Sequence, residues 1–383
     1  MLLLSLTQNK YISKMDLSYW EIKSWLTNID FTIVGSGIVG LSCALQLKSK
    51  FPKANILVLE KGALPQGAST KNAGFACFGS LSEILDDLET HSEDEVCQLV
   101  KKRVDGLQLL RETLGDKTID YQELGGYELF SNVDDLFEQC LSQKDKINAL
   151  LKSIFKTDVY STKDNVFKFE NIKSNYIFNR FEGQIDTGKM MVSLTQLALK
   201  RGIKILNKIH VDGFSEEANS VKIKTSAFEF SSSKLLIATN GFASQLINES
   251  VKPARAQVLI TKPIKNLHIK GTFHLDKGYY YFRNINDRIL FGGGRNIDFK
   301  GEETTELKQT EQIQNKLEDL LKTTILPNNP FEIDYRWSGI MGVGNQKKAV
   351  VKQLSNHVFC GVRLGGMGVA IGSLVGKELA DLT

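Results

Sequence analysis

The sequence predicts an α/β protein with two domains, one built on a mostly parallel sheet and the other on an antiparallel sheet. Two observations predict this fold class. A strand, a glycine-rich turn and a helix follow one another near the start of the chain, in FTIVGSGIVGLSCAL (31–45), and again at its end, in HVFCGVRLGGMGVAIGSLVGKELADL (357–382). Between them, residues 252–296 contain several short strands rich in aromatic residues, which is typical of an antiparallel sheet.

Length and composition are those of an ordinary globular protein with more than one core. The chain has 383 residues, of which 42% are hydrophobic and 24% charged. Its formal net charge of +4, without strong clustering of basic residues, argues against a nucleic-acid partner and gives no firm sign of a membrane partner. The five cysteines form no metal-binding or disulfide pattern, so no metal site is expected and a reducing, cytoplasmic location is favoured. The five histidines fall in no motif and are interpreted as structural or exposed.

Residues 1–27 are interpreted as an N-terminal extension followed by a short helix. The opening MLLLSLTQNK is too short an apolar run to span a bilayer, and no basic residue precedes it as in a signal peptide. Met15 is a second candidate for the start of translation. The apolar residues between Trp20 and Leu26 have helical spacing and predict a helix that covers the core, with docking to a membrane as the alternative.

The order of the expected elements predicts that the parallel-sheet domain is discontinuous. One strand–helix–strand unit runs from Phe31 to NILVLEKG (55–62), and further strands of this domain are expected in the second half of the chain. The other sheet is expected to begin at LGGYELF (124–130), and a helix is expected over 302–323. The first domain is therefore assigned residues 28–119, 186–250 and 334–383, and the second domain is assigned residues 120–185 and 251–333.

Three glycines after the first strand form the pattern G-x-G-x-x-G. Gly35 permits a tight turn, Gly37 lets backbone N–H groups approach a phosphate, and Gly40 lets the helix pack close to the strand. Glu60 closes the next strand, where its carboxylate can accept hydrogen bonds from a ribose and would repel a 2′-phosphate. The pattern therefore predicts a dinucleotide site, with an ordinary glycine-rich turn as the alternative.

A run of small and hydroxyl-bearing residues, GASTKNAGFACFG (67–79), follows the second strand. Such a run suits a backbone that lies directly against a cofactor, and a flexible polar loop is the alternative.

On these residues the chain resembles FAD-dependent oxidoreductases of the D-amino-acid oxidase superfamily, namely the glycine, sarcosine and γ-glutamylputrescine oxidases. The resemblance covers nearly the whole chain from about Leu17. It is carried by SYW (18–20), GASTKNAG (67–74), IATNG (237–241) and GGMGVAIGSLVGKELADL (365–382). It implies a Rossmann-like FAD-binding domain of the glutathione-reductase type, with an inserted α+β substrate domain whose sheet is antiparallel.

The resemblance implies that FAD is the cofactor. SGIMGVGNQKKAV (338–350), where some relatives attach FAD covalently, contains no cysteine, so the FAD is expected to be noncovalent. The residues expected to bind FAD are Gly35, Gly37, Ile38, Val39, Gly40, Glu60, Lys61, Ala68, Ser69, Thr70, Asn72, Ala73, Gly74, Val211, Ala238, Thr239, Gly241, Gly339, Gly366, Met367, Gly368 and Val369.

The resemblance also implies oxidation of a C–N bond in an amine or amino acid. In the family, hydride passes from the carbon beside nitrogen to the flavin, the imine is hydrolysed, and oxygen or another electron acceptor reoxidises the flavin. The expected partners are therefore a small amine or amino acid and an electron acceptor. Two alternatives stay open. One is a dehydrogenase that uses a quinone or carrier protein as acceptor, and the other is a flavin-binding protein without catalysis.

Three positions depart from the family's pattern. Met367 stands where members often have histidine, Gly366 where glycine oxidases have the arginine that binds the substrate carboxylate, and Ala370 at the position of the oxygen-activating lysine of sarcosine oxidases. Substrate class and oxygen reactivity therefore stay open at this point.

The candidate catalytic residues are Tyr281 and Arg283, in GYYYFRN (278–284), and Met367 at the C-terminal motif. Strand alternation predicts that Tyr281 and Arg283 share one face of the sheet with Tyr279. The alternative is an aromatic sheet face with a solvated arginine. Arg255 is interpreted as an ordinary strand residue.

Overall fold

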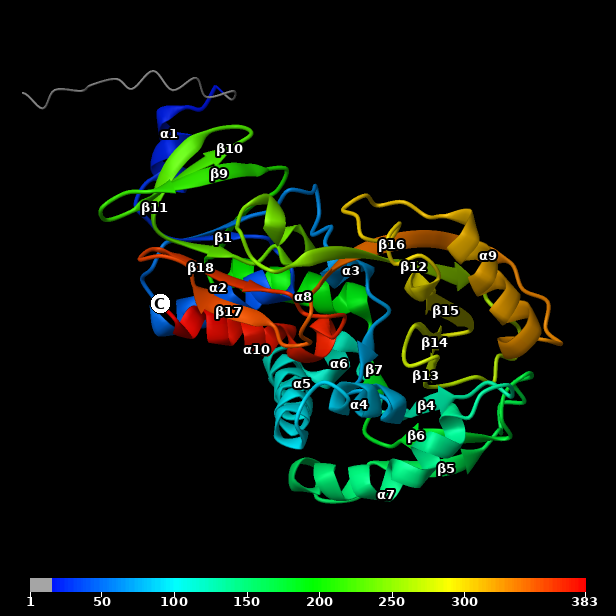
Figure 1. Ribbon diagram of the computed structural model, residues 1–383. Helices are drawn as coiled ribbons and strands as arrows, with labels where there is room; N and C mark the ends of the chain where they lie inside the picture. Colours follow the sequence, from blue (N-terminus) through cyan, green and yellow to red (C-terminus); the bar gives the residue numbers. More distant parts are fainter. Residues whose placement is uncertain (1–15) are drawn as a thin grey trace, which may run out of the picture.

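The computed structural model describes residues 16–383, so Met15 and the opening apolar run lie outside the described residues. Figure 1 shows two lobes, one around a mostly parallel sheet and the other around an antiparallel sheet. The predicted fold class is confirmed.

Eight strands of the described residues form the first sheet, in the order β17-β18-β11-β1-β2-β8 with β10 and β9 added beside β11. The central strands are parallel, whereas β17, β10 and β9 are antiparallel to their neighbours. The strands are β1 (Ile29–Val34), β2 (Ile56–Leu59), β8 (Lys204–Leu206), β9 (Val211–Glu216), β10 (Val221–Thr225), β11 (Glu229–Ile237), β17 (Val350–Gln353) and β18 (Val358–Val362).

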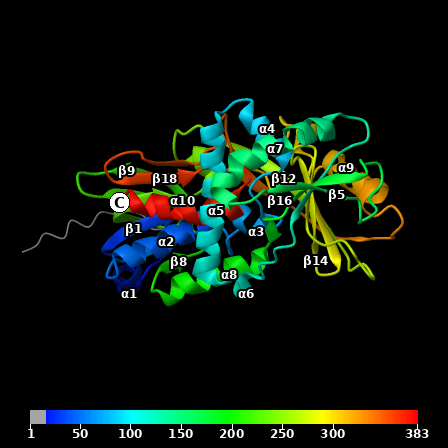
Figure 2. The same cartoon turned by 90° about the horizontal axis from the view of Figure 1, so that it is seen from below.

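Alternation along β1 explains how this sheet is covered on both faces. Phe31 and Ile33 pack with the apolar side chains of helices, whereas Val34 points to the opposite face and packs with those of β9 and β10. On the helical side, α10 (Gly368–Asp381) packs against both α2 (Ile38–Lys50) and α5 (Glu93–Leu114) (Figure 2). The helix that follows the first strand and the last helix of the chain therefore lie together on one face of the sheet.

Eight further strands form the antiparallel lobe, in the order β16-β12-β15-β14-β13-β4-β6-β5, with one parallel pair between β13 and β4. One face carries stacked aromatic side chains, among them Phe273 and Phe282, and is covered by α9 (Glu311–Leu320). The opposite face lies toward the first lobe. The strands are β4 (Gly126–Leu129), β5 (Tyr160–Asp164), β6 (Asn175–Asn179), β12 (Lys252–Thr261), β13 (Thr272–Leu275), β14 (Tyr280–Ile285), β15 (Arg288–Gly293) and β16 (Ile333–Val343).

The remaining elements connect the two lobes. A two-stranded sheet pairs β3 (Phe75–Ala76) with β7 (Gly183–Gln184). The helices not yet named are α1 (Tyr19–Glu21), η1 (Ile22–Leu26), α3 (Ala68–Lys71), α4 (Leu81–Leu88), α6 (Asp116–Ile119), α7 (Leu136–Phe155), α8 (Thr187–Lys200), η2 (Asn240–Gln245), η3 (Arg295–Ile297) and η4 (Leu321–Ile325).

Three local expectations differ from the structure. The N-terminal helix forms, but it covers the core only through its flanks, because Trp20 and Trp25 are 68% and 40% exposed. The helix expected over 302–323 begins only at Glu311, since Glu302 is instead buried in an ion pair. β16 pairs with β12 in the antiparallel sheet, so the domain boundary expected at 334 falls inside this strand.

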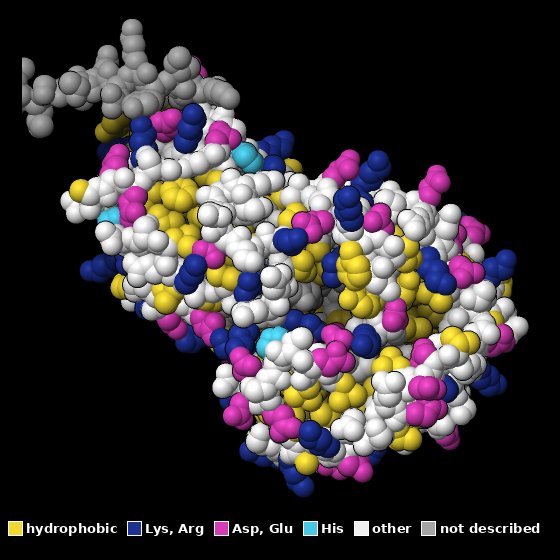
Figure 3. All heavy atoms as spheres, in the orientation of Figure 1, with side chains coloured by type: hydrophobic (Ala, Val, Ile, Leu, Met, Phe, Trp, Pro, Cys, Tyr) yellow, Lys and Arg dark blue, Asp and Glu magenta, His cyan; other side chains and the backbone are white. Residues whose placement is uncertain are grey.

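No helix within residues 16–383 has the length and apolarity needed to cross a membrane. The same residues contain no group of three or more His, Cys, Asp or Glu side chains placed to hold a metal ion. On the face shown in Figure 3, basic and acidic side chains are interspersed.

Candidate functional site

A cavity of about 610 Å³ brings the first and last glycine-rich segments of the chain together. Its lining includes the turn between β1 and α2, the α3 segment, the end of β11, part of β16 and the start of α10. Its far end reaches the antiparallel sheet at β13, β14 and β15. The volume lies in the range of small-molecule and cofactor sites.

The β1–α2 turn depends on its glycines. Gly35 has φ +104°, and a Cβ there would lie 2.8 Å from the carbonyl oxygen of Ala238. A Cβ at Gly40 would lie 1.9 Å from the carbonyl oxygen of Gly35. The backbone N–H of Ile38, in the first turn of α2, donates to Ser69 Oγ at 2.9 Å. The positive helix end and a hydroxyl thus meet at the place expected for a pyrophosphate.

Glu60 is held at the end of β2 by three hydrogen bonds. Its Oε2 accepts from Ser36 Oγ at 2.7 Å and from the Ser36 N–H at 3.1 Å, and its Oε1 accepts from the Gly62 N–H at 2.9 Å. The side chain is buried and lines the cavity. Oε1 accepts only one of these hydrogen bonds and keeps a second lone pair, so the fixed carboxylate can also accept a ribose hydroxyl.

Hydrogen bonds of the Asn72 side chain hold the α3 segment in place. Asn72 Oδ1 accepts from the Gly74 N–H at 2.8 Å and from Thr187 Oγ1 at 2.9 Å, and Asn72 Nδ2 donates to the carbonyl of Ser69 at 2.8 Å. Thr70 instead donates its hydroxyl proton inside the loop, to the carbonyl of Pro65 at 2.6 Å. The segment is therefore an ordered wall of the cavity, which the flexible-loop alternative did not foresee.

The C-terminal segment supplies the start of α10. Gly366, just before this helix, has φ +87°. The first helical hydrogen bond of α10 runs from the N–H of Ile371 to the carbonyl oxygen of Met367. The preceding N–H groups, from Gly368 to Ala370, have no partner within the helix. Gly368, Val369 and Ala370 all line the cavity.

The residues of this cavity fit FAD. Thr239 Oγ1 is buried at the cavity wall and has no hydrogen-bond partner among residues 16–383, as expected for a group that bonds to a ligand. Val211, expected near adenine, and Met367, expected near the flavin ring, line the same cavity.

Most residues expected to bind FAD line the cavity, and four do not: Gly40, Thr70, Gly74 and Gly241. Each has a packing or bonding role instead. A Cβ at Gly241 would lie 2.5 Å from the carbonyl oxygen of Met341, and one at Gly74 would lie 2.4 Å from that of Ile185. The lining residues of the expected set are Gly35, Gly37, Ile38, Val39, Glu60, Lys61, Ala68, Ser69, Asn72, Ala73, Val211, Ala238, Thr239, Gly339, Gly366, Met367, Gly368 and Val369.

Of the expected catalytic residues, Tyr281 and Met367 line the cavity and Arg283 does not. Arg283 is buried, and its guanidinium donates to the carbonyl oxygens of Ala73 and, at 2.9 Å, of Ile185. Burial lowers its pKa to about 10. The solvated arginine considered from the sequence is therefore wrong, and Arg283 instead holds the end of the α3 segment against β7.

One row of residues across the antiparallel sheet faces the cavity. Strand pairing aligns His274 of β13 with Tyr281 of β14, Tyr281 with Gly292 of β15, and Gly292 with Val258 of β12. A Cβ at Gly292 would lie 2.7 Å from the Tyr281 ring, so this glycine admits the phenol side chain. Burial raises the pKa of Tyr281 to about 12, which keeps the phenol neutral at ordinary pH.

Sequence reasoning missed several residues of this wall. His274, interpreted as structural or exposed, lines the cavity with Phe75, Cys77 and Arg295. Cys77 Sγ lies 3.8 Å from Met367 Sδ. The alternation that placed Tyr281 could have found His274 only if the pairing of β13 with β14 had been known.

Comparisons with known proteins agree with this geometry. Residues 30–382 match the family of FAD dependent oxidoreductases (DAO). The chain is 22% identical over 375 residues to the probable oxidoreductase OrdL of Haemophilus influenzae, covering 93% of this chain and 83% of that protein. It is 21% identical over 370 residues to the gamma-glutamylputrescine oxidoreductase of Escherichia coli, with 92% and 83% covered.

The fold is also similar to that of the glycine oxidase of Geobacillus kaustophilus, with a TM-score of 0.73, 17% identity, and 92% and 94% of the two chains covered. The family match spans nearly all of the described residues and includes both glycine-rich segments that line the cavity. This chain therefore belongs to the DAO family of FAD-dependent oxidoreductases, and FAD is its cofactor.

Proposed function

We propose that the enzyme oxidises a C–N bond of an amine or amino acid, with hydride transfer to noncovalent FAD, hydrolysis of the imine and reoxidation by oxygen. The observation that carries the proposal is the extent of the cavity. Beyond the residues assigned to FAD it continues to Tyr281, His274 and Arg295, which leaves a polar-lined space for a small substrate. The names of the relatives, an amine oxidoreductase and an amino-acid oxidase, support the same chemistry.

Bound FAD supplies a two-electron acceptor for the hydride. The chain's own groups hold and polarise the reactants. The N–H groups at the start of α10 that have no partner within the helix would stabilise negative charge on the reduced cofactor. The neutral phenol of Tyr281 donates a hydrogen bond to a substrate carboxylate or accepts one from a substrate nitrogen. Met367 packs at the cavity wall beside Cys77, and burial raises the pKa of this thiol well above its ordinary value, which favours noncovalent FAD.

A visible spectrum and an anaerobic substrate panel test the function. Purified protein should be yellow, and denaturation should release the flavin into the supernatant. Amines and amino acids, starting with γ-glutamylputrescine and glycine, are then added without oxygen. At least one is expected to bleach the flavin and yield the matching carbonyl product and ammonia or amine. If a broad panel leaves the flavin oxidised, the proposed chemistry is wrong.

A dehydrogenase is the second candidate, and Ala370 is the observation in its favour. Ala370 lines the cavity in the first turn of α10, so no cationic side chain is present at the position where the sarcosine oxidases have their oxygen-activating lysine. The two functions differ in the fate of the electrons. An oxidase forms one hydrogen peroxide per substrate in air, whereas a dehydrogenase reduces an added quinone or dye and forms little peroxide.

Arg295 is expected to bind the carboxylate of an amino-acid substrate. It lines the cavity, its guanidinium stacks on Phe299 at 4.8 Å, and no hydrogen bond or carboxylate partner is found for the guanidinium within residues 16–383. We predict that Arg295→Met raises KM for amino acids about 10- to 100-fold while changing KM for the corresponding amines little. Steady-state kinetics on matched amino acid and amine pairs check this. Equal effects on both members of a pair would contradict the role.

A further inference from the structure

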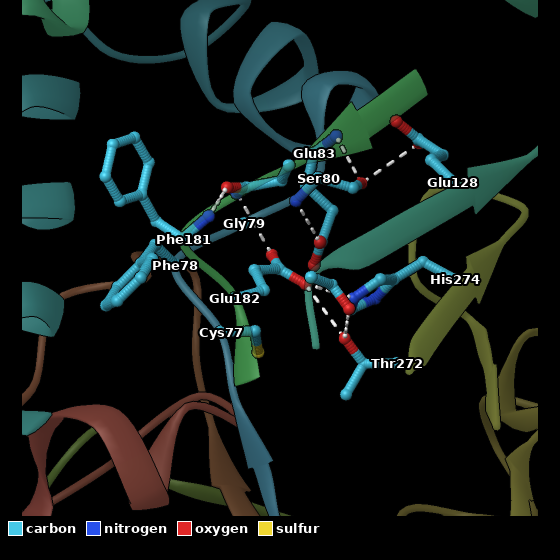
Figure 4. Close-up of polar contacts among 12 residues, drawn as sticks. Cys77, Phe78, Gly79, Ser80, Glu83, Glu128, Phe181, Glu182, Thr272 and His274 are labelled. Atoms are coloured by element: carbon cyan, nitrogen blue, oxygen red, sulfur yellow. Dashed lines mark hydrogen bonds and ion pairs between the residues drawn. The ribbon is translucent and has the colours of Figure 1, made fainter. Parts of the chain in front are cut away.

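A buried histidine and a buried glutamate form a pair in the wall of the cavity (Figure 4). His274, on β13, donates from Nε2 to Oε2 of Glu182 at 2.9 Å. The two residues are 5% and 0% exposed. His274 lines the cavity, whereas Glu182 lies behind it in the loop between β6 and β7. Removing two such groups from water is costly, and stability alone is a weak reason to retain them.

The fold makes specific room for this pair. A Cβ at Gly126 would lie 2.0 Å from Glu182 Oε2, so only glycine at this position of β4 admits the carboxylate. The carboxylate also lies 3.4 Å from Asn179 Nδ2 and 3.4 Å from Thr272 Oγ1, both of which can donate to it. On the cavity side, the edge of the Phe75 ring packs on the imidazole, with 5.3 Å between the ring centroids.

The hydrogen bond to Glu182 sets which nitrogen of His274 is available. Because Nε2 faces a carboxylate, it carries a hydrogen, and in the neutral ring the lone pair is then on Nδ1. No partner for Nδ1 is found within the part of the chain that the structure describes. The adjacent residue in the sheet, Tyr281, also lines the cavity, so the imidazole and the phenol flank one space.

Charged and titratable groups from several elements surround the imidazole. Burial lowers the pKa of His274, but the attraction of Glu182 and, more weakly, of Glu83 and Glu128 outweighs it and raises the pKa to about 9. A cavity of about 10 Å³ separates Glu128 from the pair, and burial raises the pKa of Glu128 to about 7. Besides the carboxyls of Glu83 and Glu128, the titratable and charged groups around the His274–Glu182 pair are those of Cys77, Arg103, Tyr160 and Tyr281.

We propose that His274 Nδ1 accepts a proton from the ammonium group of the substrate, and that Glu182 is the positioning residue that orients the ring and stabilises its charged form. This assignment rests on the proposed amine or amino-acid substrate. The pair has the arrangement of a general base, His274, whose ring is oriented by a buried carboxylate, Glu182.

The step balances without any further reactant. The N–H bond of the substrate ammonium breaks, and the proton moves to Nδ1 of His274. The nitrogen keeps the electron pair, which forms the C=N bond as the hydride leaves the adjacent carbon with two electrons for FAD. The products are an iminium ion, a protonated His274 and the reduced cofactor. Hydride loss needs the nitrogen lone pair, so the ammonium form cannot react until the proton has left.

The role predicts a specific pH dependence. Below pH 9 most His274 is already protonated, so the fraction able to accept a proton rises about tenfold per pH unit and levels off near pH 9. The kcat of the wild-type enzyme should therefore rise toward alkaline pH. Glu182→Gln removes the attraction that favours the imidazolium. The rising limb of the plot of kcat against pH should therefore move to lower pH by about two pH units.

Two variants and two substrates show which ionising group causes the rising limb of the pH profile. Glu128→Gln is the matched control, because it removes a buried carboxyl on the adjacent strand whose attraction on the imidazole is weaker than that of Glu182, so it should lower the pH of the limb much less than Glu182→Gln does. Substrates with different amine pKa values separate ionisation of the substrate from that of the enzyme. A limb that follows the substrate, or that stays in place in Glu182→Gln, overturns the proposal. His274→Gln should lower kcat about 100-fold or more at pH 9, with FAD retained.

An NMR titration of the histidine rings tests the pair without catalysis. With five histidines in the chain, His274→Gln assigns the resonance by its disappearance. In the FAD-loaded enzyme this resonance should titrate near pH 9, and in Glu182→Gln about two pH units lower. Titration near the ordinary value in both proteins overturns the pair. If no substrate reduces the flavin, the proposed function fails and the proton step fails with it, whereas the titration still decides whether the pair exists.

Discussion

Gly35→Ala is expected to abolish stable binding of FAD. The residue has φ +104°, which an alanine adopts only with strain, and the new Cβ would lie 2.8 Å from the carbonyl oxygen of Ala238. Relief of this contact must move either the turn or the end of β11, and both line the cavity. We expect a loss of about 3 kcal/mol in binding, or more than about 100-fold in Kd. Gel filtration followed by visible absorbance measures the retained flavin.

Gly213→Ala is the matched control for this prediction. Gly213 lies on β9, has no positive φ, and a Cβ there would meet nothing within 4 Å. This variant should retain a full complement of FAD. If Gly35→Ala keeps its flavin at wild-type affinity, the turn does not hold the pyrophosphate as described.

Arg255→Ala is expected to cause the largest loss of stability, about 3–5 kcal/mol in the free energy of unfolding. The guanidinium makes a two-point contact with Glu302, at 2.9 Å from Nε to Oε2 and 2.6 Å from Nη2 to Oε1. Both side chains are nearly fully buried, at 4% and 2% exposed. Alanine would leave the Glu302 carboxylate without its cation. Of the described residues, only Gln257 would still donate to this carboxylate, at 3.0 Å. Denaturant unfolding with saturating FAD measures the change.

Lys262→Ala supplies the comparison, at the residue that directly follows β12. Lys262 pairs with Glu332 on the surface, where the side chains are 55% and 72% exposed. Exposed pairs contribute little, so this variant should unfold at nearly the wild-type denaturant concentration. If both variants lost a similar free energy of unfolding, burial of the Arg255–Glu302 pair would not be the cause of the loss in Arg255→Ala.

Most residues expected to bind FAD line one cavity, and this grouping was predictable because their signals are local in the sequence. Gly35, Gly37 and Glu60 belong to one strand–helix–strand unit whose geometry is set by short turns. Asn72 lies in a segment whose hydrogen bonds run mostly within a few residues. The packing role of Gly40 was expected, whereas that of Gly241 was less visible, because a glycine that permits close packing gives the same sequence pattern as one that contacts a ligand.

The far end of the cavity, where we propose that the substrate binds, depends on contacts between distant segments, which the sequence does not encode locally. Alternation correctly placed Tyr281 and Arg283 on the same face of β14, but it could not show that Arg283 reaches the carbonyl of Ala73 instead of the cavity. His274 becomes visible only when β13 pairs with β4 and β14. The delayed start of α9 has a similar cause, since a tertiary ion pair holds Glu302 outside the helix.

The structure of the protein crystallised with FAD tests the central claim most directly. The account predicts one extended FAD, with adenine beside Val211, ribose at Glu60, pyrophosphate on the Gly35–Gly40 turn, and the flavin ring between the start of α10 and Tyr281. It would be contradicted by FAD bound elsewhere, or by a closed cavity in which packed side chains separate the first and last glycine segments.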